Sequence, residues 1–237
     1  MDSLKGCMRE FRLVIFDCDG VLVDSERISN RVFCSMLNEL GLAVTLEDMF
    51  QNFVGLSMPR CVERMTDMLG NPPPADFVKN LRQRTDAALR EQVVPVPGVP
   101  EMLEDIGLPY CVASSGDHEK IRLTLGATGL LGKFTDRIYS VVDVENPKPA
   151  PDVFLHAARQ MGVEPAECVV IEDTPTGVIA GVAAGMYVLG FCAHTPAARL
   201  KEAGAHAVFG EMRLLAELLE EAAHPSIAAD APQAAPR

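Results

Sequence analysis

The sequence predicts an α/β fold, with a doubly wound, Rossmann-like parallel sheet as its core and a helical cap domain inserted after the first strand. Short apolar runs alternate with helix-like segments, which is typical of a parallel sheet covered by helices on both faces. One interval, 25–93, has helical periodicity throughout and is far too long for an ordinary crossover between strands. We therefore expect a core of 1–24 and 94–221, a helical cap of 25–93, and a disordered, Ala/Pro-rich tail over 222–237.

Six apolar runs are the expected strands. In chain order they are Leu13–Phe16, Tyr110–Ala113, Arg137–Val142, Cys168–Ile171, Met186–Phe191 and a short edge run, Ala207–Phe209. Helices between the later runs are expected to begin near Asp117, Pro151 and Thr174, because these residue types favour helix starts. A final amphipathic helix is expected over 211–221.

The predicted cap has its own start and stop signals. Helices are expected to begin near Ser25, Thr45, Ser57 and Ala75, and three consecutive prolines at 72–74 separate the last two. The proline-rich stretch at 94–98 is typical of a stiff linker that returns to the sheet. An insert that begins directly after the first strand is well placed to cover the end of that strand.

Composition excludes some classes of protein. The net charge of −12 argues against a nucleic-acid partner, for which a basic face is expected. A content of 48% hydrophobic residues supports a real core in a chain of 237 residues. The seven cysteines form no CxxC pair, and the N-terminus has no apolar signal segment, so we expect reduced thiols in a cytoplasmic protein. A monomer and a small homo-oligomer both remain open.

The segment 174–198 contains no charged residue, and Gly177, Gly181 and Gly185 repeat in it at the spacing of a membrane helix-pairing face. Its length could span a bilayer. However, Thr174 followed by proline is a typical helix start, and the last glycine precedes a β-like run. We expect these glycines to let a helix lie close against the sheet, in a protein that does not enter the membrane.

Two carboxylates end the first apolar run. Asp17 and Asp19 are one residue apart and are followed by Gly20, and side chains at i and i+2 share a face of an extended chain. Two neighbouring anions at the mouth of a sheet repel each other unless a cation or a proton lies between them. Because unpaired acids at the end of a buried strand are costly, the pair indicates a chemical role.

Polar residues also follow three of the later runs. Ser114 and Ser115 follow the second, Lys148 follows the third between two prolines, and Glu172 and Asp173 follow the fourth. In a doubly wound sheet, ligands bind outside the carboxyl ends of the strands. Each feature alone has a plainer explanation as a loop, a surface turn or a helix start, but together they indicate one site.

These residue types suit phosphoryl transfer. Carboxylates from two strands, Asp17 and Asp173, offer the hard oxygen ligands of Mg²⁺, which also binds phosphate. The Ser114 hydroxyl and nearby backbone N–H groups can hold phosphate oxygens, and Lys148 can neutralise charge in the transition state. One aspartate of the first pair can attack phosphorus while its neighbour protonates the leaving oxygen and later activates water.

Four motifs stand at these strand ends: Asp17–Glu26, the Ser114 strand end, Lys148–Asp152 and Ile171–Gly177. They resemble the four motifs of the haloacid dehalogenase-like (HAD) superfamily. The subgroup is the one with a helical cap between the first two strands, similar to β-phosphoglucomutase and sugar-phosphate phosphatases. The resemblance extends over 12–209, with one mild departure, Pro147 in place of a common glycine.

The resemblance implies a role for each motif residue. Asp17 would be the nucleophile and a Mg²⁺ ligand, and Asp19 the general acid and base as well as a main-chain carbonyl ligand of the metal. The phosphate-binding residues would be Ser114, Ser115 and Lys148, and Asp173, with Glu172 beside it, would complete the metal site.

Departures from the motifs favour hydrolysis. Mutases of the β-phosphoglucomutase type have a histidine shortly after the first motif, in the region where Ser29 stands here, and a cap arginine where Met58 stands, although Arg60 lies close by. True dehalogenases lack the second aspartate, so Asp19 argues against carbon–halogen cleavage. Phosphonatases use a cap lysine as a Schiff base, and Lys79 lies in no motif of that kind.

We therefore expect a Mg²⁺-dependent phosphatase that acts on a small phosphorylated sugar or sugar acid. A hexose-phosphate mutase is the alternative enzyme. A phosphoacceptor switch without catalysis is disfavoured, because a cap would bury its phosphorylation site. The residues expected to contact the substrate are Asn52, Ser57 and Arg60 in the cap and His118 in the core, and each has a plainer explanation as a surface or capping residue.

Overall fold

The core of the protein is a single parallel sheet of six strands. The computed structural model describes residues 9–53 and 56–223, and every strand pairing in it is parallel, in the order β3-β2-β1-β4-β5-β6. The predicted fold class is confirmed. The strands are β1 (Leu13–Phe16), β2 (Tyr110–Ser114), β3 (Ile138–Ser140), β4 (Cys168–Glu172), β5 (Tyr187–Phe191) and β6 (Ala207–Phe209).

The prediction for β3 was too long. The strand has three residues, and Val141–Asp143 forms a 3-10 turn instead. The side chain of Ser140 accepts a hydrogen bond from the turn, and the Asp143 carboxylate accepts one from the Ser140 N–H at 2.9 Å. This local capping box ends the strand although the sequence remains apolar.

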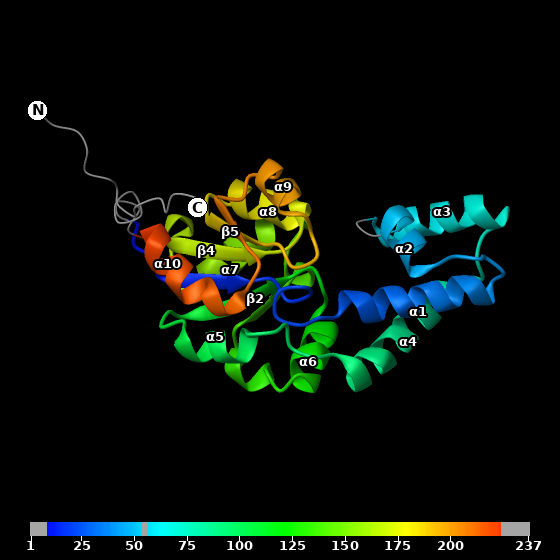
Figure 1. Cartoon of the computed structure of the whole chain (residues 1–237), viewed down its shortest axis with the longest axis horizontal. Helices are drawn as coiled ribbons and strands as arrows, with labels where there is room; N and C mark the ends of the chain where they lie inside the picture. Colours follow the sequence, from blue (N-terminus) through cyan, green and yellow to red (C-terminus); the bar gives the residue numbers. More distant parts are fainter. Residues whose placement is uncertain (1–8, 54–55, 224–237) are drawn as a thin grey trace, which may run out of the picture.

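Helices cover both faces of the sheet (Figure 1). Alternate residues of β1 point to opposite faces, so Val14 and Phe16 belong to one buried cluster and Leu13 and Ile15 to the other. The first cluster includes residues of α5 (Val99–Asp105), α6 (His118–Ala127) and α10 (Leu215–Ala223), and the second includes residues of α7 (Asp152–Met161), α8 (Pro175–Ala183) and α9 (Ala197–Glu202). This is the doubly wound arrangement.

Of the five helices that the structure describes between β1 and β2, the first four extend away from the sheet (Figure 1). They are α1 (Glu26–Glu39), α2 (Leu46–Asn52), α3 (Met58–Leu69) and α4 (Phe77–Gln92). They have a hydrophobic cluster of their own, which includes Phe33, Leu37, Met49 and Met65. Thr45 forms the predicted capping box with Asp48, whereas α4 begins two residues after the expected start. We call these four helices the cap helices.

Two chain segments join the cap helices to the sheet, and they run side by side. Val23 and Pro95 form an antiparallel bridge. The N–H of Asp24 donates to the carbonyl of Val94 at 3.0 Å, and the N–H of Val96 donates to the carbonyl of Leu22 at 3.0 Å. The insertion therefore leaves and returns at one place, directly after β1. The tail was expected over 222–237, but Ala222 and Ala223 still belong to α10 (Leu215–Ala223). The rest of that tail, 224–237, and Val54-Gly55 of the cap lie outside the described residues.

The uncharged segment at 174–198 folds as part of the core. It forms α8 and β5, and Gly185 turns the chain between them with a φ of 74°. Across 9–53 and 56–223, no helix combines the length and the apolar character needed to span a membrane. A Cβ atom at Gly181 would lie 2.8 Å from Cγ2 of Val188 in β5, so this glycine lets α8 lie close against the sheet.

The close contact at Gly181 makes a testable prediction. Gly181→Ala should lower the free energy of unfolding by about 1–3 kcal/mol, because the methyl group overpacks the helix–sheet interface. The matched control is Gly126→Ala in α6, where the nearest atom would be 3.9 Å away. The control should leave stability unchanged or raise it by up to about 1 kcal/mol through helix propensity. Urea unfolding measures both, and equal effects would contradict the packing argument.

Candidate active site

A buried lysine connects two carboxylates at the carboxyl edge of the sheet. Lys148 lies in the loop after β3, and its Nζ is 2.7 Å from Oδ1 of Asp17 and 2.7 Å from Oε1 of Glu172. It also donates to the carbonyl of Ala113 at 3.2 Å. The lysine side chain is only 4% exposed. Burial alone would lower the pKa of Lys148, but the two carboxylates more than offset it and raise the pKa above its usual range. The ammonium group therefore stays charged.

Asp17 follows β1 and lies at the centre of this cluster. Burial raises the pKa of Asp17 to about 7, although Lys148 opposes the shift. The negative charges of Glu172 and Asp19 contribute to it. A carboxylate with these neighbours needs further positive charge to remain ionised at neutral pH.

Asp19 has a different environment. Its Oδ2 accepts a hydrogen bond from Nζ of Lys120 at 2.8 Å, and its Oδ1 accepts one from the Ser25 hydroxyl. Burial would raise the pKa of Asp19, but Lys120 and Ser25 outweigh this effect and lower it. The environment therefore raises the pKa of Asp17 and lowers that of Asp19.

Sequence reasoning missed Lys120. It lies in the first turn of α6, three residues after Asp117, whose side chain caps that helix by accepting from the N–H of Lys120 at 2.9 Å. The signal that could have found it is positional, because α6 begins at the same edge of the sheet as the Ser114 strand end.

Asp173, directly after β4, has an unsatisfied oxygen. Its Oδ1 is buried without a hydrogen-bond partner, and burial together with the charges of Glu172, Asp17 and Glu26 raises its pKa well above the usual range. Gly20, with a φ of 78°, passes so close that any Cβ there would collide with the Asp173 carboxylate. A buried carboxylate oxygen without a partner, close to a second carboxylate, is what a cation site requires.

The donor set fits Mg²⁺. In the part of the chain that the structure describes, no three Asp, Glu, His or Cys side chains form a ready metal cluster. The expected ligands are instead two carboxylates, Asp17 and Asp173, and the main-chain carbonyl of Asp19. Mg²⁺ commonly binds through one or two carboxylates and keeps several waters. The fit therefore rests on the hard oxygen donors and on the unpartnered Oδ1 of Asp173.

Glu172 has other partners. Besides Lys148, its carboxylate accepts hydrogen bonds from the N–H of Thr174 at 3.0 Å and from the Thr174 hydroxyl at 2.9 Å. Gly177 leaves the space that this carboxylate occupies, since a Cβ there would overlap it. Both oxygens of Glu172 are thus engaged, and its predicted place among the metal ligands stays a prediction.

The two serines after β2 differ in exposure. Ser114 is 1% exposed, and its hydroxyl accepts a hydrogen bond from the N–H of Gly116 at 3.0 Å, whereas Ser115 is exposed. The carbonyl of Gly116 accepts in turn from the Ser140 hydroxyl at 2.6 Å. This network holds the turn after β2 in place beside Lys148, which bonds the carbonyl of Ala113.

The residues predicted to contact substrate lie in two places. Three are in or next to the cap helices: Asn52 accepts from Arg64, Ser57 precedes α3, and Arg60 pairs with Glu63 at 2.8 Å. The fourth, His118, begins α6 in the core, and its Nε2 lies 2.8 Å from Asp143. None of the hydrogen bonds named here involves Asp17, and the contact of these four residues with substrate stays a prediction.

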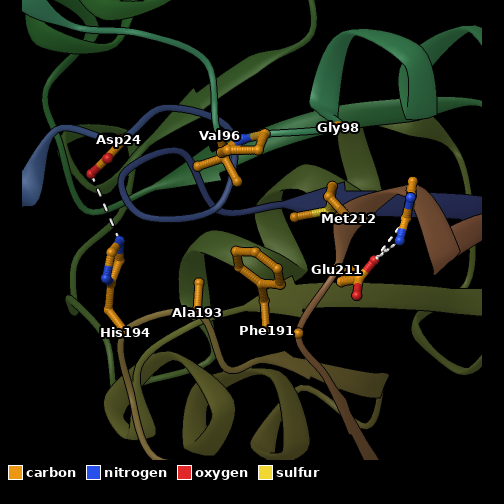
Figure 2. A pocket seen from close by; sticks show the side chains of 11 residues that line it. Asp24, Val96, Gly98, Phe191, Ala193, His194, Glu211 and Met212 are labelled. Atoms are coloured by element: carbon orange, nitrogen blue, oxygen red, sulfur yellow. Dashed lines mark hydrogen bonds and ion pairs between the residues drawn. The ribbon is translucent and has the colours of Figure 1, made fainter.

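A separate cavity of about 500 Å³ lies beside the root of the cap helices (Figure 2). Figure 2 shows Asp24 facing His194 at one end and Glu211 at the other, with Phe191 and Met212 between them. The motif residues Asp17, Asp19, Lys148 and Asp173 do not line it. We therefore assign the chemistry to the acidic cluster and not to this cavity.

The fold and the acidic cluster define the class of protein: a Rossmann-like enzyme with two carboxylates after its first strand and helices inserted behind them. The chain belongs to the haloacid dehalogenase-like hydrolase family, whose sequence profile matches residues 14–191.

Several of the named relatives are phosphatases. The chain is 31% identical over 187 residues to 6-phosphogluconate phosphatase of Escherichia coli (strain K12), covering 78% of this chain and 85% of the relative. It is 31% identical over 176 residues to fructose-1-phosphate phosphatase of the same strain, covering 73% of this chain and 92% of the relative. The crystal structure of a HAD family hydrolase from Deinococcus radiodurans R1, with bound phosphate and sodium, matches with a TM-score of 0.78 and 34% identity, covering 90% and 96% of the two chains. The protein is a phosphoric monoester hydrolase.

The unpartnered carboxylate of Asp173 makes a prediction about stability. In EDTA, Asp173→Asn should unfold with a higher free energy than the wild type. The folded-state pKa of Asp173 is raised, so wild-type stability falls as pH rises from about 4 towards that pKa, by up to about 1.4 kcal/mol per pH unit. The advantage of the variant should therefore grow with pH over this range. Urea unfolding between pH 4 and 8 measures it.

Added Mg²⁺ provides the second half of the same test. The wild type should gain about 2.7 kcal/mol at a Mg²⁺ concentration one hundred times the dissociation constant, and Asp173→Asn much less. Asp67→Asn, an exposed aspartate on α3, is the matched control and should respond like the wild type. An equal gain from Mg²⁺ in Asp173→Asn would contradict the assigned cation site.

Proposed function

We propose that this protein is a Mg²⁺-dependent phosphatase that hydrolyses the phosphate ester of a small sugar or sugar acid through an aspartyl-phosphate on Asp17. The observation that carries the proposal is the buried ammonium group of Lys148, 2.7 Å from the Asp17 carboxylate. A carboxylate that attacks a phosphate dianion faces like-charge repulsion, which at ~4 Å costs about 4 kcal/mol at an effective dielectric of 20. Lys148 supplies positive charge where this repulsion arises.

The residues divide the reaction between them. Asp19, whose pKa Lys120 and Ser25 lower, first takes up a proton from solvent as the substrate binds. An oxygen of Asp17 then attacks phosphorus, and the bond from phosphorus to the ester oxygen breaks as Asp19 gives that oxygen this proton. Asp19, now ionised, takes a proton from water, whose oxygen attacks phosphorus and releases inorganic phosphate and Asp17. Lys148 and the Ser114 hydroxyl bind the oxygens of the transferred group, and Glu172 holds Lys148 in place. When bound, Mg²⁺ would supply charge neutralisation for the phosphoryl oxygens.

The substrate class is supported by the named relatives, whose substrates are a phosphorylated sugar acid and a phosphorylated sugar. The cap helices and His118 would contact the remainder of the substrate. Ser29 and Met58, at positions where mutases of this family have a histidine and an arginine, favour water as the acceptor. Six free cysteines among the described residues, five of them buried, support a cytoplasmic location.

The nucleophile is tested by Asp17→Asn. This variant keeps the size of the side chain but removes the attacking anion, so release of inorganic phosphate should fall by at least about 10³-fold at saturating Mg²⁺. The wild type, quenched in acid during turnover, should contain a phosphorylated fraction by intact-protein mass spectrometry, and the variant should not. Circular dichroism checks that the variant is folded.

The acceptor is tested by phosphorus NMR of the wild-type reaction. A phosphatase releases inorganic phosphate from 6-phosphogluconate or fructose 1-phosphate, whereas a mutase returns an isomeric hexose phosphate and little inorganic phosphate.

Two outcomes would contradict the proposed function. Unreduced turnover in Asp17→Asn would refute the aspartyl-phosphate, and slow turnover of every monoester would favour a phosphoacceptor switch instead.

A further inference from the structure

The geometry points to Lys120 as a positioning residue for proton transfer by Asp19, an inference that rests on the proposed function. Nζ of Lys120 lies 2.8 Å from Oδ2 of Asp19, and the Ser25 hydroxyl donates to the other oxygen. One donor at each oxygen fixes the rotation of the carboxylate, which Ser25 alone cannot do. The Asp19 side chain is 24% exposed and so has space to turn if a donor is lost.

The place of Lys120 in its own helix supports a role beyond helix stability. It lies in the first turn of α6, where the helix dipole disfavours a cation and favours an anion. Its nitrogen forms an ion pair with a carboxylate 101 residues away in sequence instead of pointing into water. Helix formation does not explain a lysine here, whereas the contact with Asp19 does.

The start of α6 is itself held from two sides. One oxygen of Asp117 accepts from the N–H of Lys120 at 2.9 Å, and the other accepts from Arg82 at 2.7 Å. Arg82 belongs to the cap helix α4, which packs against α6 (Figure 1). The backbone from which Lys120 extends is therefore fixed relative to both the sheet and the cap helices. A lysine side chain that extends from this fixed backbone can hold the Asp19 carboxylate in one orientation.

Lys120 and Lys148 have separate tasks. Lys148 contacts Asp17 and Glu172, and Lys120 contacts Asp19. Lys148 thus acts where the phosphoryl group binds, and Lys120 acts on the group that moves the proton. Loss of Lys120 should accordingly impair a step that needs a proton more than a step that does not.

The test compares two esters in Lys120→Met. The value of kcat/KM covers the steps up to the first irreversible one, here formation of the aspartyl-phosphate with loss of the leaving group. An alkyl ester such as 6-phosphogluconate or fructose 1-phosphate needs a proton on its leaving oxygen, whereas p-nitrophenyl phosphate does not. We expect kcat/KM to fall about 10-fold or more for the alkyl ester and less than about 3-fold for the aryl ester.

Three reference variants make the result specific. Asp19→Asn should show the same dependence on the leaving group with a larger loss. Lys120→Arg, which keeps a cationic donor, should recover most of the alkyl-ester activity. Lys133→Met is the matched control, because Lys133 is also 32% exposed and also pairs with a carboxylate, that of Glu104. It should behave as the wild type with both esters, and thermal melts confirm folding of each variant.

Each result bears on the inference. Equal losses with both esters and a raised KM would show that Lys120 binds phosphate directly, and this would overturn the inference. Unchanged kcat/KM with the alkyl ester would overturn it as well, while the proposed function would stand. A wild type inactive on all three esters would instead refute the proposed function, and the inference with it.

Discussion

The contact of Lys148 with the carboxylates of Asp17 and Glu172 is the interaction on which the rest of the site depends. Three carboxylates, those two and Asp173, are buried within a few residues of the strand ends. Without a cation, burial and mutual repulsion would favour their neutral forms, and a neutral Asp17 cannot act as a nucleophile. One buried ammonium group cannot balance three such charges, and the same electrostatics support the proposed Mg²⁺ beside Asp173.

Sheet topology explains why these groups meet. The chain moves from β1 to β2 on one side and returns to β4 on the other, so the order reverses between β1 and β4. Ligands bind at such a switch point, because the loops that leave neighbouring strands there diverge to opposite faces. Asp17 follows β1, and Glu172 and Asp173 end and follow β4, which places the acids on both sides of the reversal. Lys148 reaches the cluster from beyond β2, where the loop after β3 crosses the strand ends.

The predictable parts of this site are those that depend on strand ends. A buried parallel strand is an apolar run, so its end is visible in sequence, and Asp17, Ser114 and Asp173 could be placed at one edge without coordinates. The partners of Glu172 could not, because whether its oxygens contact a metal, Lys148 or Thr174 depends on side-chain conformations that the sequence pattern does not specify. Lys120 was missed because it reaches Asp19 from a helix, and helical periodicity marks the buried face better than the contacts of a long polar side chain. The end of β3 was misplaced since the Ser140 capping box overrides an apolar sequence.

The cap helices show why the residues that contact the substrate are harder to predict than the residues that act on the phosphate. They have a hydrophobic cluster of their own, although Ile28 of α1 and Leu89 of α4 belong to a cluster of the sheet and α4 also packs against α6. Much of the hydrophobic packing of the cap helices is therefore local to them, and the strand ends do not determine it. Asn52 donates to the carbonyl of Asp48 and Arg60 pairs with Glu63, both within the cap helices, and these contacts do not reveal what either residue would bind. The charged groups expected to act on the phosphate lie in contact with one another, because Lys148 pairs with the carboxylates of Asp17 and Glu172. Acids and a lysine at neighbouring strand ends can be recognised in the sequence.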